Sequence, residues 1–265
     1  MKVDYHLHTN FSTDSKEVME LYCKAAIEQG IKEIAITDHV DLGVVNMYVS
    51  EQIVDYPKYA IEVARLQKKY SNQVCLRKGL ELGVQLEYLN EYEAIVKDND
   101  LDFVIMSCHQ IDNKEFWLND YQKEKTPYEC FESYYTYLIE LVKVFPNFSV
   151  IGHLDLMKRY SEYTPQVDDE HEEVIKELLQ ILIDYNKGIE VNTSGIRYDL
   201  TSFHPSEKIL RWYYELGGRI ITLGSDAHNV KDLGNGIEEA RILLKKIGFE
   251  YITTYEKMQP FFHKL

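Results

Sequence analysis

Short apolar runs alternate with longer amphipathic stretches along the whole chain, and this alternation constrains the fold more than any other feature. Each apolar run has the length of a buried strand, and the stretches between runs carry apolar residues at helical spacing. The strand–helix unit recurs about seven times, with no linker or low-complexity tract between units. Parallel strands joined by crossover helices satisfy this pattern, so we predict an α/β fold built on one parallel barrel.

The length of the chain also suits a single barrel. The 265 residues match one unit of this kind, and we treat residues 1–265 as one domain. We expect strands at 3–8, 33–37, 74–81, 101–109, 148–153, 188–194 and 219–226, with a weaker one at 249–253. We expect helices at 16–29, 55–70, 88–98, 128–144, 168–186, 206–216 and 237–247. The long connections 41–54 and 110–126 are expected to be active-site loops.

Two histidines stand on the first predicted strand, in the run His6-Leu7-His8. Successive side chains of a strand point to opposite faces, so His6 and His8 point the same way. Two neutral imidazoles on one rigid face make half of a binding site for a transition metal. A core histidine followed by a loop histidine would give the same pattern, so further ligands are needed to distinguish the two cases.

Candidate ligands follow at the ends of the later predicted strands. They are His39, Glu81, His109, His153, Asp226 and His228. In a parallel barrel all strands open at their carboxyl ends on one face, so these side chains should converge on one site. Asp14, in the turn before the first predicted helix, either joins them or caps that helix, and we favour the ligand role.

This ensemble resembles the polymerase and histidinol phosphatase (PHP) family. The resemblance rests on motifs that run in order along the chain: His6-Leu7-His8, Thr37-Asp38-His39, Gly79-Leu80-Glu81, Ser107-Cys108-His109, Gly152-His153-Leu154-Asp155 and Ser225-Asp226-Ala227-His228. It implies a distorted, TIM-like barrel of seven β/α units with a trinuclear metal centre at the carboxyl ends of the strands. The implied ligand groups are His6, His8, Glu81 and Asp226 for one metal, Glu81, His109 and His153 for a second, and Asp14, His39 and His228 for a third.

The chemistry of the donors agrees with that implication. Imidazole-rich sites with bridging carboxylates suit three ions of Zn, Mn or Fe better than Ca or Mg. Clustered metals lower the pKa of a bound water and stabilise charge on phosphate oxygens, which favours hydrolysis of a phosphomonoester. The group that protonates the leaving alcohol is left open between Asp226, a bound water and an acid behind the ligands.

Two arginines and three aromatic residues are expected to complete a substrate site. Arg159 and Arg197 follow the fifth and sixth predicted strands and resemble positions that hold phosphate in the histidinol-phosphatase branch of the family. A guanidinium offers phosphate two parallel donors, which a lysine cannot match. Phe116, Trp117 and Tyr160 lie on the same face and either wall a ring-bearing substrate or pack the loops.

Charge and composition exclude several other classes of partner. The formal net charge is -15 and no basic stripe is visible, so we expect no nucleic-acid partner. No apolar run approaches the roughly 20 residues that span a bilayer, and we expect no membrane partner. The four cysteines have no paired spacing and the first predicted strand begins too early for a signal peptide. We therefore expect a cytoplasmic protein with reduced thiols; a homo-oligomer is left open.

The remaining polar residues have simpler explanations. The acidic stretch 168–173, which includes His171, is expected to be a solvated helix start, because carboxylates in a first turn are favoured by the helix dipole. His204 could at most lie behind a ligand, and His263 is expected at the surface.

The leading hypothesis is a metal-dependent histidinol-phosphate phosphatase of histidine biosynthesis, acting on a small phosphorylated substrate. Its specific part comes from the family resemblance; the metallohydrolase part follows from the ligands themselves. Three alternatives are a PHP-type phosphoesterase acting on nucleotides or another small phosphomonoester, an amidohydrolase-type barrel, and a metal-binding regulatory domain without turnover. The second histidine group at His39 and the Asp226-Ala227-His228 run fit the amidohydrolase pattern poorly.

Overall fold

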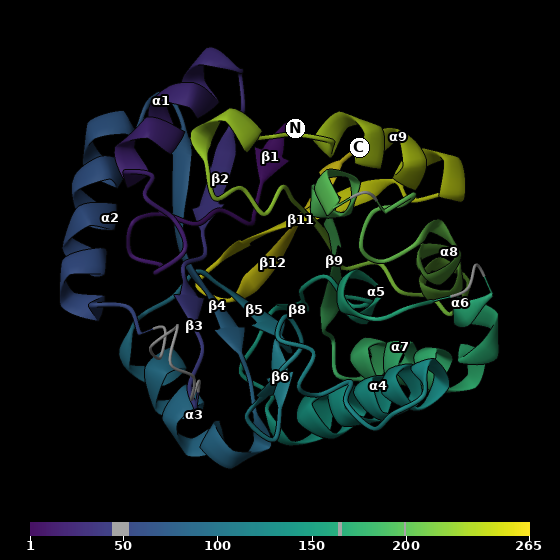
Figure 1. The fold of residues 1–265 in the computed structure, drawn as a ribbon. Coiled ribbons are helices and arrows are strands. Elements are labelled where there is room, and N and C mark those ends of the chain that lie inside the picture. The colour runs from purple at the N-terminus through teal and green to yellow at the C-terminus, as the bar shows by residue number, and fades with distance from the viewer. Residues whose placement is uncertain (44–52, 164–165, 199) are drawn as a thin grey trace.

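The computed structural model describes residues 1–43, 53–163, 166–198 and 200–265. At its centre, parallel strands curl into a nearly closed barrel with the order β1-β2-β4-β5-β8-β9-β10 (Figure 1). These strands are β1 (Val3–Asp4), β2 (Glu33–Ile36), β4 (Cys75–Gly83), β5 (Phe103–Ser107), β8 (Val150–Ile151), β9 (Gly188–Asn192) and β10 (Ile221–Gly224). The predicted seven-stranded α/β barrel is confirmed.

The barrel closes along the segment that carries the first two histidines. The chain beyond β1 runs beside β10, where the Tyr5 N–H donates to the Leu223 carbonyl at 2.8 Å and the His8 N–H donates to the Ala227 carbonyl at 3.0 Å. On the other side, β3 (His39–Val40) continues β2, because both pair in parallel with β4 in one register. His8 and His39 are thus built into the wall of the barrel.

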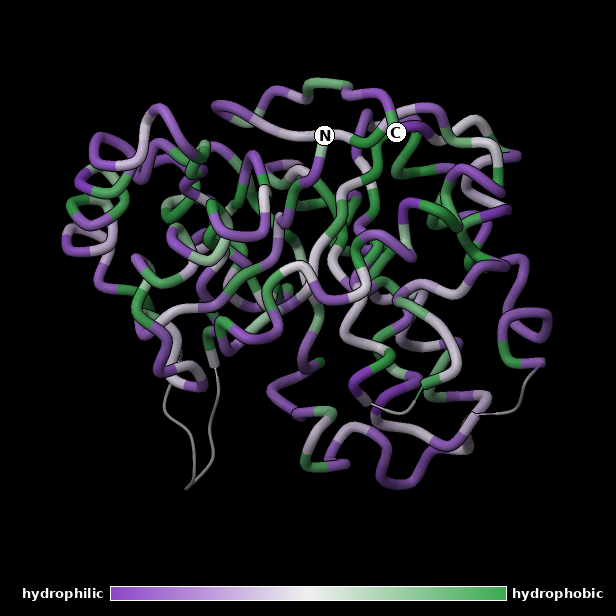
Figure 2. Tube along the Cα trace, turned by 90° about the horizontal axis from the view of Figure 1, so that it is seen from above, coloured by the Kyte–Doolittle hydropathy of each residue, from purple (hydrophilic) through white to green (hydrophobic). Residues whose placement is uncertain are grey.

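The α-helices form the outer layer of the barrel (Figure 1). They are α1 (Met19–Glu28), α2 (Tyr56–Tyr70), α3 (Leu89–Asp98), α4 (Pro127–Val144), α5 (Met157–Tyr160), α6 (Val167–Glu170), α7 (Glu172–Asp184), α8 (Glu207–Glu215) and α9 (Ile237–Ile247). Thr126 and Glu129 form a reciprocal capping box at the start of α4, which satisfies backbone N–H groups that the helix leaves free. Hydrophobic segments gather inside the molecule in Figure 2. Among the described residues, every helix is too short or too polar to cross a bilayer.

Two antiparallel hairpins lie outside the barrel sheet. One, β6 (Gln110–Ile111) with β7 (Lys114–Glu115), stands in the connection after β5 and gives it a defined shape. The other is β11 (Tyr251–Glu256) with β12 (Gln259–Lys264), and β11 overlaps the weaker strand expected at 249–253, beginning two residues later. The backbone N–H of Tyr255 in β11 donates to the Tyr5 hydroxyl at 2.9 Å, which ties this hairpin to the barrel.

The structure differs from several predicted elements. Two strands are shorter than expected, β1 against 3–8 and β8 against 148–153, and the expected loop 110–126 contains the β6–β7 hairpin. The first helix begins at Met19 and has Val18 as its N-cap, so Asp14 does not cap it. The helix expected at 168–186 is divided into α6 and α7 at His171, which is buried with its ring against Tyr128 instead of solvated. Most of the predicted loop 41–54 lies outside the described residues.

Candidate metal centre

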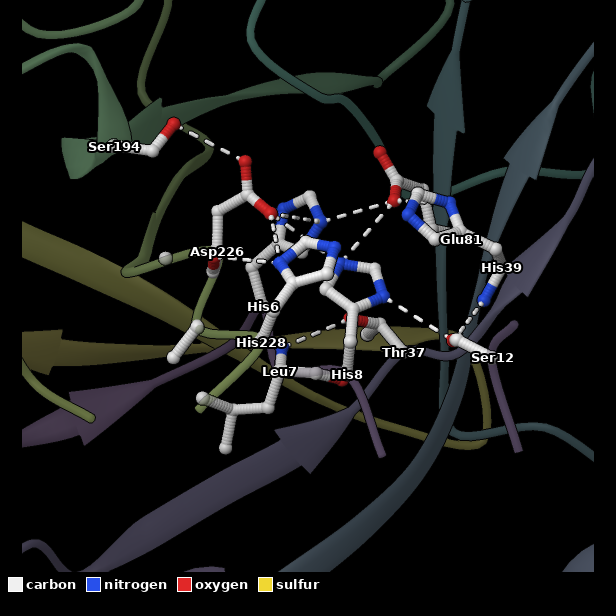
Figure 3. A network of polar contacts seen from close by, with 12 residues as sticks. His6, Leu7, His8, Ser12, Thr37, His39, Glu81, Ser194, Asp226 and His228 are labelled. Carbon is white, nitrogen blue, oxygen red and sulfur yellow. Dashed lines mark hydrogen bonds and ion pairs between the residues drawn. The ribbon is translucent and has the colours of Figure 1, made fainter. Parts of the chain in front are cut away.

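All nine predicted ligand residues lie around one space at the carboxyl ends of the barrel strands. We call them the ligand cluster: His6, His8, Asp14, His39, Glu81, His109, His153, Asp226 and His228. Figure 3 shows imidazoles from distant parts of the chain turning toward Glu81 and Asp226. The barrel topology explains the convergence, since each residue stands at or just beyond the end of a parallel strand or in the turn after one.

Glu81, on β4, is at the centre of the cluster. One of its oxygens, Oε2, lies 3.1 Å from His6 Nε2 and 3.0 Å from His39 Nδ1. The other, Oε1, lies 2.8 Å from His153 Nε2 and 3.3 Å from His109 Nε2. His8 Nε2 also lies 3.5 Å from Oε2. A single buried carboxylate therefore faces imidazoles with both of its oxygens, which is the arrangement of a bridging ligand.

The second side of the cluster is organised by Asp226 and Asp14. Asp226 Oδ1 lies 3.4 Å from His8 Nε2 and 3.5 Å from His228 Nδ1. Asp14 Oδ2 lies 3.0 Å from His228 Nε2 and 3.4 Å from His39 Nε2. With its capping role removed, Asp14 is left between two imidazoles, as the ligand interpretation predicts.

The residues present fit a bound transition metal. Buried polar atoms normally have hydrogen-bond partners, yet His6 Nε2, His8 Nε2 and Glu81 Oε2 have none. Within the described residues, overlapping groups of three donors could hold an ion, among them Glu81 with His109 and His153. Buried imidazole nitrogens and carboxylate oxygens are the donor types that Zn, Mn and Fe prefer.

The electrostatics keep the carboxylates of the cluster ionised. Burial opposes ionisation of Glu81, but the charges of His6 and His39 outweigh it and hold the pKa of Glu81 well below its usual range. The pKa of Asp226 is likewise well below its usual range, because the charge of His6 outweighs burial. Burial lowers the pKa of His8 to about 3, so its ring stays neutral and keeps a lone pair for a metal.

Two ligand residues have uncommon backbone conformations. His153 has a φ of 24° and Asp226 a φ of 55°, in the left-handed region where residues other than glycine are rare. Arg197 supports the second of these: its Nη2 donates to the carbonyls of Ser225 and Asp226, both at 2.7 Å. Strain of about 1–3 kcal/mol per residue is typical where a functional side chain has to be aimed.

A cavity of about 520 Å³ opens above the cluster. Beyond ligand residues, its lining includes Gln110, Glu115, Trp117, Arg159, Tyr160 and Tyr198. The Arg159 guanidinium lies 3.8 Å above the ring of Tyr198, and its Nη2 donates to Ser194 Oγ at 2.7 Å. The buried Arg159 Nε makes no hydrogen bond, so donor capacity remains beside the metal ligands.

Of the aromatic residues and arginines predicted to bind substrate, some line the cavity and others do not. Trp117 and Tyr160 line the cavity, as does Arg159. Phe116 does not: its ring is fully buried against Tyr121 and Tyr134, which agrees with the second of its two predicted roles, packing of the loop, and not with a substrate wall.

Arg197 is not among the described residues that line this cavity, because its Nη2 is turned to backbone carbonyls. Its Nη1 is buried without a hydrogen bond.

Sequence reasoning missed the carboxylates that stand behind the histidines. Asp41 Oδ1 accepts a hydrogen bond from His109 Nδ1 at 2.7 Å, and Glu190 Oε1 accepts one from His6 Nδ1 at 2.7 Å. The available signal for Glu190 was a single acidic residue inside the apolar run 188–194. For Asp41 it was only proximity to the preceding ligand motif.

Sequence reasoning also missed a group of hydrogen bonds, centred on Asp38, that holds the turn carrying Asp14 in place. The Asp38 carboxylate accepts hydrogen bonds from the Thr9 N–H at 2.6 Å and from Ser12 Oγ at 2.7 Å. Ser12 Oγ in turn accepts the backbone N–H of His39 at 3.0 Å (Figure 3). Asp38 thus fixes the turn to the neighbouring strand end.

His204 lies outside the ligand cluster and belongs to another buried group. This paired cluster consists of Asp155, Lys158, Asp168 and His204. Lys158 Nζ lies 2.8 Å from Asp155 Oδ2 and 2.7 Å from Asp168 Oδ1, and His204 Nδ1 lies 2.5 Å from Asp155 Oδ1. The expectation that Asp168 is a solvated helix-start residue is therefore wrong, because its carboxylate is buried against Lys158.

The fold and the cluster together define a class of protein: a parallel α/β barrel with an imidazole–carboxylate site that could hold metal ions at the carboxyl ends of its strands. Comparison with known proteins gives the family. The model of the PHP domain matches residues 4–194, and the chain belongs to that family.

Individual relatives match over nearly their full length. A histidinol-phosphatase of Lactococcus lactis is 33% identical over 266 residues, covering 97% of this chain and 96% of the relative. A probable histidinol-phosphatase of Clostridium acetobutylicum is 31% identical and covers 91% of each chain. The crystal structure of the L. lactis histidinol phosphate phosphatase, complexed with zinc, L-histidinol and phosphate, superposes with a TM-score of 0.88 at 31% identity over 98% of both chains.

Proposed function

We propose that this protein is a metal-dependent histidinol-phosphate phosphatase, which hydrolyses L-histidinol phosphate to L-histidinol and phosphate in histidine biosynthesis. The observation that carries the proposal is the agreement over 98% of both chains with a solved histidinol phosphate phosphatase that holds zinc, L-histidinol and phosphate. The geometry adds independent support, since the ligand cluster lies at the floor of a cavity that also presents an arginine and aromatic rings.

Three ions of Zn, Mn or Fe are proposed, held by the three ligand groups that the family resemblance implies. The short distances from Glu81 to His109 and His153, and from Asp14 to His39 and His228, support the second and third groups. When bound, the ions would supply an activated water and neutralise charge on the phosphate. The choice among the three metals is left to measurement.

The chain's own residues would bind and orient the substrate. Arg159 is proposed to hold the phosphate, because its guanidinium lies in the cavity beside the ligands. Arg197 is proposed to assist through its free Nη1 while its Nη2 braces Asp226. Trp117 and Tyr160 are proposed to contact the imidazole ring of the substrate.

Asp226 fits the role of a ligand better than that of a proton donor. Its pKa is well below its usual range, so the carboxyl group carries no proton near neutral pH. Its Oδ2 also accepts a hydrogen bond from Ser194 Oγ at 3.1 Å (Figure 3). The leaving alcohol would therefore receive its proton from another group.

The decisive experiment measures phosphate release by the metal-loaded protein from L-histidinol phosphate, from nucleotides and from a generic aryl phosphate. We expect kcat/KM to be highest for L-histidinol phosphate and activity to disappear after metal removal. Comparable activity on nucleotides would favour the alternative, a phosphoesterase for other small phosphomonoesters. Bound metal with no turnover of any ester would favour a binding domain. A cytoplasmic location and the oligomeric state remain predictions.

A further inference from the structure

We propose that Asp41 and Glu190 are positioning residues that determine which ring nitrogen the ligand histidines present to the metals. The inference rests on the ligand set proposed above. An imidazole has two nitrogens, and when Nδ1–H is donated to a carboxylate the lone pair is left on Nε2. The two carboxylates would therefore hold His109, through Asp41, and His6, through Glu190, with Nε2 toward the centre of the cluster.

Glu190 provides the clearer geometry. Its Oε1 accepts a hydrogen bond from His6 Nδ1 at 2.7 Å, while His6 Nε2 lies on the opposite side of the ring, 3.1 Å from Glu81 Oε2. Its Oε2 is fixed by the His153 N–H at 3.0 Å and by Asn192 Nδ2 at 3.1 Å. With only 1% of Glu190 exposed, it cannot touch a substrate and acts only through the groups around it.

Asp41 stands behind His109. Its Oδ1 accepts from His109 Nδ1 at 2.7 Å, and His109 Nε2 faces Glu81 at 3.3 Å. Its Oδ2 lies 3.4 Å from His39 Nδ1 without a hydrogen bond, and that nitrogen is closer to Glu81 Oε2, at 3.0 Å. Asp41 is thus placed to orient His109, a ligand of the second metal.

Two glycines make room for these carboxylates. A Cβ on Gly83, at the end of β4, would lie 1.7 Å from Asp41 Oδ1. A Cβ on Gly224, at the end of β10, would lie 2.1 Å from Glu190 Oε1. Neither glycine has a left-handed φ, so space and not backbone conformation explains glycine at both positions. The strand ends are therefore shaped around the carboxylates as well as around the ligands.

The experiment measures metal affinity and does not depend on turnover. The wild-type protein and the variants Asp41→Asn and Glu190→Gln are stripped of metal and titrated with Zn²⁺ against a chromophoric chelator. Each amide keeps the size of the side chain but loses charge and an acceptor. We expect each substitution to weaken Zn²⁺ binding about 10–100-fold. The weakened binding step should be that of the ion whose histidine ligand the lost carboxylate orients. Asp120→Asn is the control, since it removes an exposed carboxylate that pairs with Lys123.

The two substitutions should weaken the binding of different ions. Asp41→Asn should weaken the step that His109 serves, because its hydrogen bond reaches the ring of that ligand. Glu190→Gln should weaken the step that His6 serves, because among the ligand rings of the described residues its hydrogen bond reaches His6 alone. Far-UV circular dichroism confirms that each variant is folded. Affinities equal to those of wild type and Asp120→Asn would overturn the inference while leaving the ligand set intact; wild-type protein that binds no Zn²⁺ would overturn both.

Gly83→Ala tests the same idea without altering any charge. Its methyl group should displace the Asp41 carboxylate and weaken Zn²⁺ binding as Asp41→Asn does. In an Asp41→Ala background the clash with the carboxylate is gone and the 3.0 Å contact of the methyl group with His109 Nδ1 remains, so Gly83→Ala should then have a much smaller effect. An equal loss in both backgrounds would show that Gly83 acts independently of Asp41 and would overturn this part of the argument.

Discussion

Two groups of buried charge lie close together in this protein, and they are built in opposite ways. In the paired cluster, Lys158 lies within 2.8 Å of two carboxylates, so the charges are matched by the chain itself. In the ligand cluster the donor atoms His6 Nε2, His8 Nε2 and Glu81 Oε2 are buried without a hydrogen bond. The paired cluster also has two such atoms, His204 Nε2 and Asp168 Oδ1, but Asp168 Oδ1 lies 2.7 Å from Lys158 Nζ. Only one residue, Leu154, separates His153 of the ligand cluster from Asp155 of the paired cluster.

The comparison shows that burial of charge does not by itself mark a functional site. A buried ion pair with matched partners is usually neutral to stability as a whole, but removing one partner is costly. A buried set of donors that lack partners is costly as it stands, and a bound cation can relieve that cost. The ligand cluster should therefore respond to loss of metal, and the paired cluster should respond to loss of a charge.

The largest expected effect is that of removing the central carboxylate of the ligand cluster. Glu81→Ala should lower kcat/KM for L-histidinol phosphate on the order of 10⁴-fold, because the several kcal/mol that bound metals supply would be lost. Metal content, measured by elemental analysis of the purified variant, should fall with activity. The barrel should remain folded by circular dichroism.

His6→Ala serves as a second ligand variant and should lose metal in the same way. Turnover that persists in metal-depleted wild-type protein would contradict the proposed mechanism, and would remove the functional distinction between the two clusters.

The reverse behaviour is expected for the paired cluster. Lys158→Met removes the cation that Asp155 and Asp168 share and leaves Asp155 with His204 and Asp168 with a hydrogen bond from Ser206 Oγ. The loss of a buried partner should lower the free energy of unfolding by about 3–5 kcal/mol. Urea denaturation measures the loss, and elemental analysis of the folded protein should show the wild-type amount of metal. If Lys158→Met lost its metal but kept its stability, the paired cluster would be part of the metal site.

The convergence of the ligand residues was predictable because the ends of parallel strands are equivalent positions. His6, His39, His153 and Asp226 each follow an apolar run, so knowing the order of the runs sufficed to bring them to one face. Nothing beyond local pattern was required. The alternation of apolar and amphipathic runs likewise predicted the barrel and the approximate bounds of most elements. The assignment of ligands to three groups came only from the PHP resemblance.

The residues behind the ligands could not be predicted, because their contacts depend on closure of the barrel. Glu190 meets His6 across 184 positions of sequence. Phe116 and Trp117 are adjacent in the sequence, but the side chain of Phe116 is fully buried and that of Trp117 is 45% exposed. That difference is determined by the loop that follows the β6–β7 hairpin, for which the sequence carried no clear periodicity. Lys158 and Asp168 likewise meet only once α5 and α6 are in place.

Smaller effects are expected from substituting the two arginines near the ligand cluster, and only one of the two substitutions should also lower the metal content. Arg159→Ala should raise KM for L-histidinol phosphate about 10–100-fold, the loss of a hydrogen bond to a charged group worth about 1.5–3 kcal/mol. Arg197→Ala should raise KM as well and should also lower metal content, because Arg197 braces the backbone of Asp226. Steady-state kinetics at saturating metal measure the first effect, and elemental analysis measures the second. An unchanged KM for either variant would remove that arginine from the phosphate site.

The smallest expected effect is a dependence of stability on pH that belongs to the paired cluster. Burial opposes ionisation of Asp155, but the charges of Lys158 and His204 outweigh it and hold the pKa of Asp155 below its usual range. Burial of Lys158 is likewise outweighed by Asp155 and Asp168, so the pKa of Lys158 is raised. The Asp155 contribution is therefore present above its unfolded-state pKa of about 3.9 and is lost as pH falls through the lower folded-state pKa. The Lys158 contribution is present below about pH 10.4 and is lost only above it.

Comparing wild type with Asp155→Asn isolates this dependence from metal release at acid pH, since both proteins carry the same ligand cluster. The difference in free energy of unfolding, measured with urea, should shrink as the pH falls from about 5 to below about 4. It shrinks because Asp155 of the wild type takes up a proton in the unfolded chain at a higher pH than in the folded protein, which favours unfolding. A difference that grew on acidification would mean that Asp155 is stabilised in its neutral form, and the paired cluster would then not be held together by its charges.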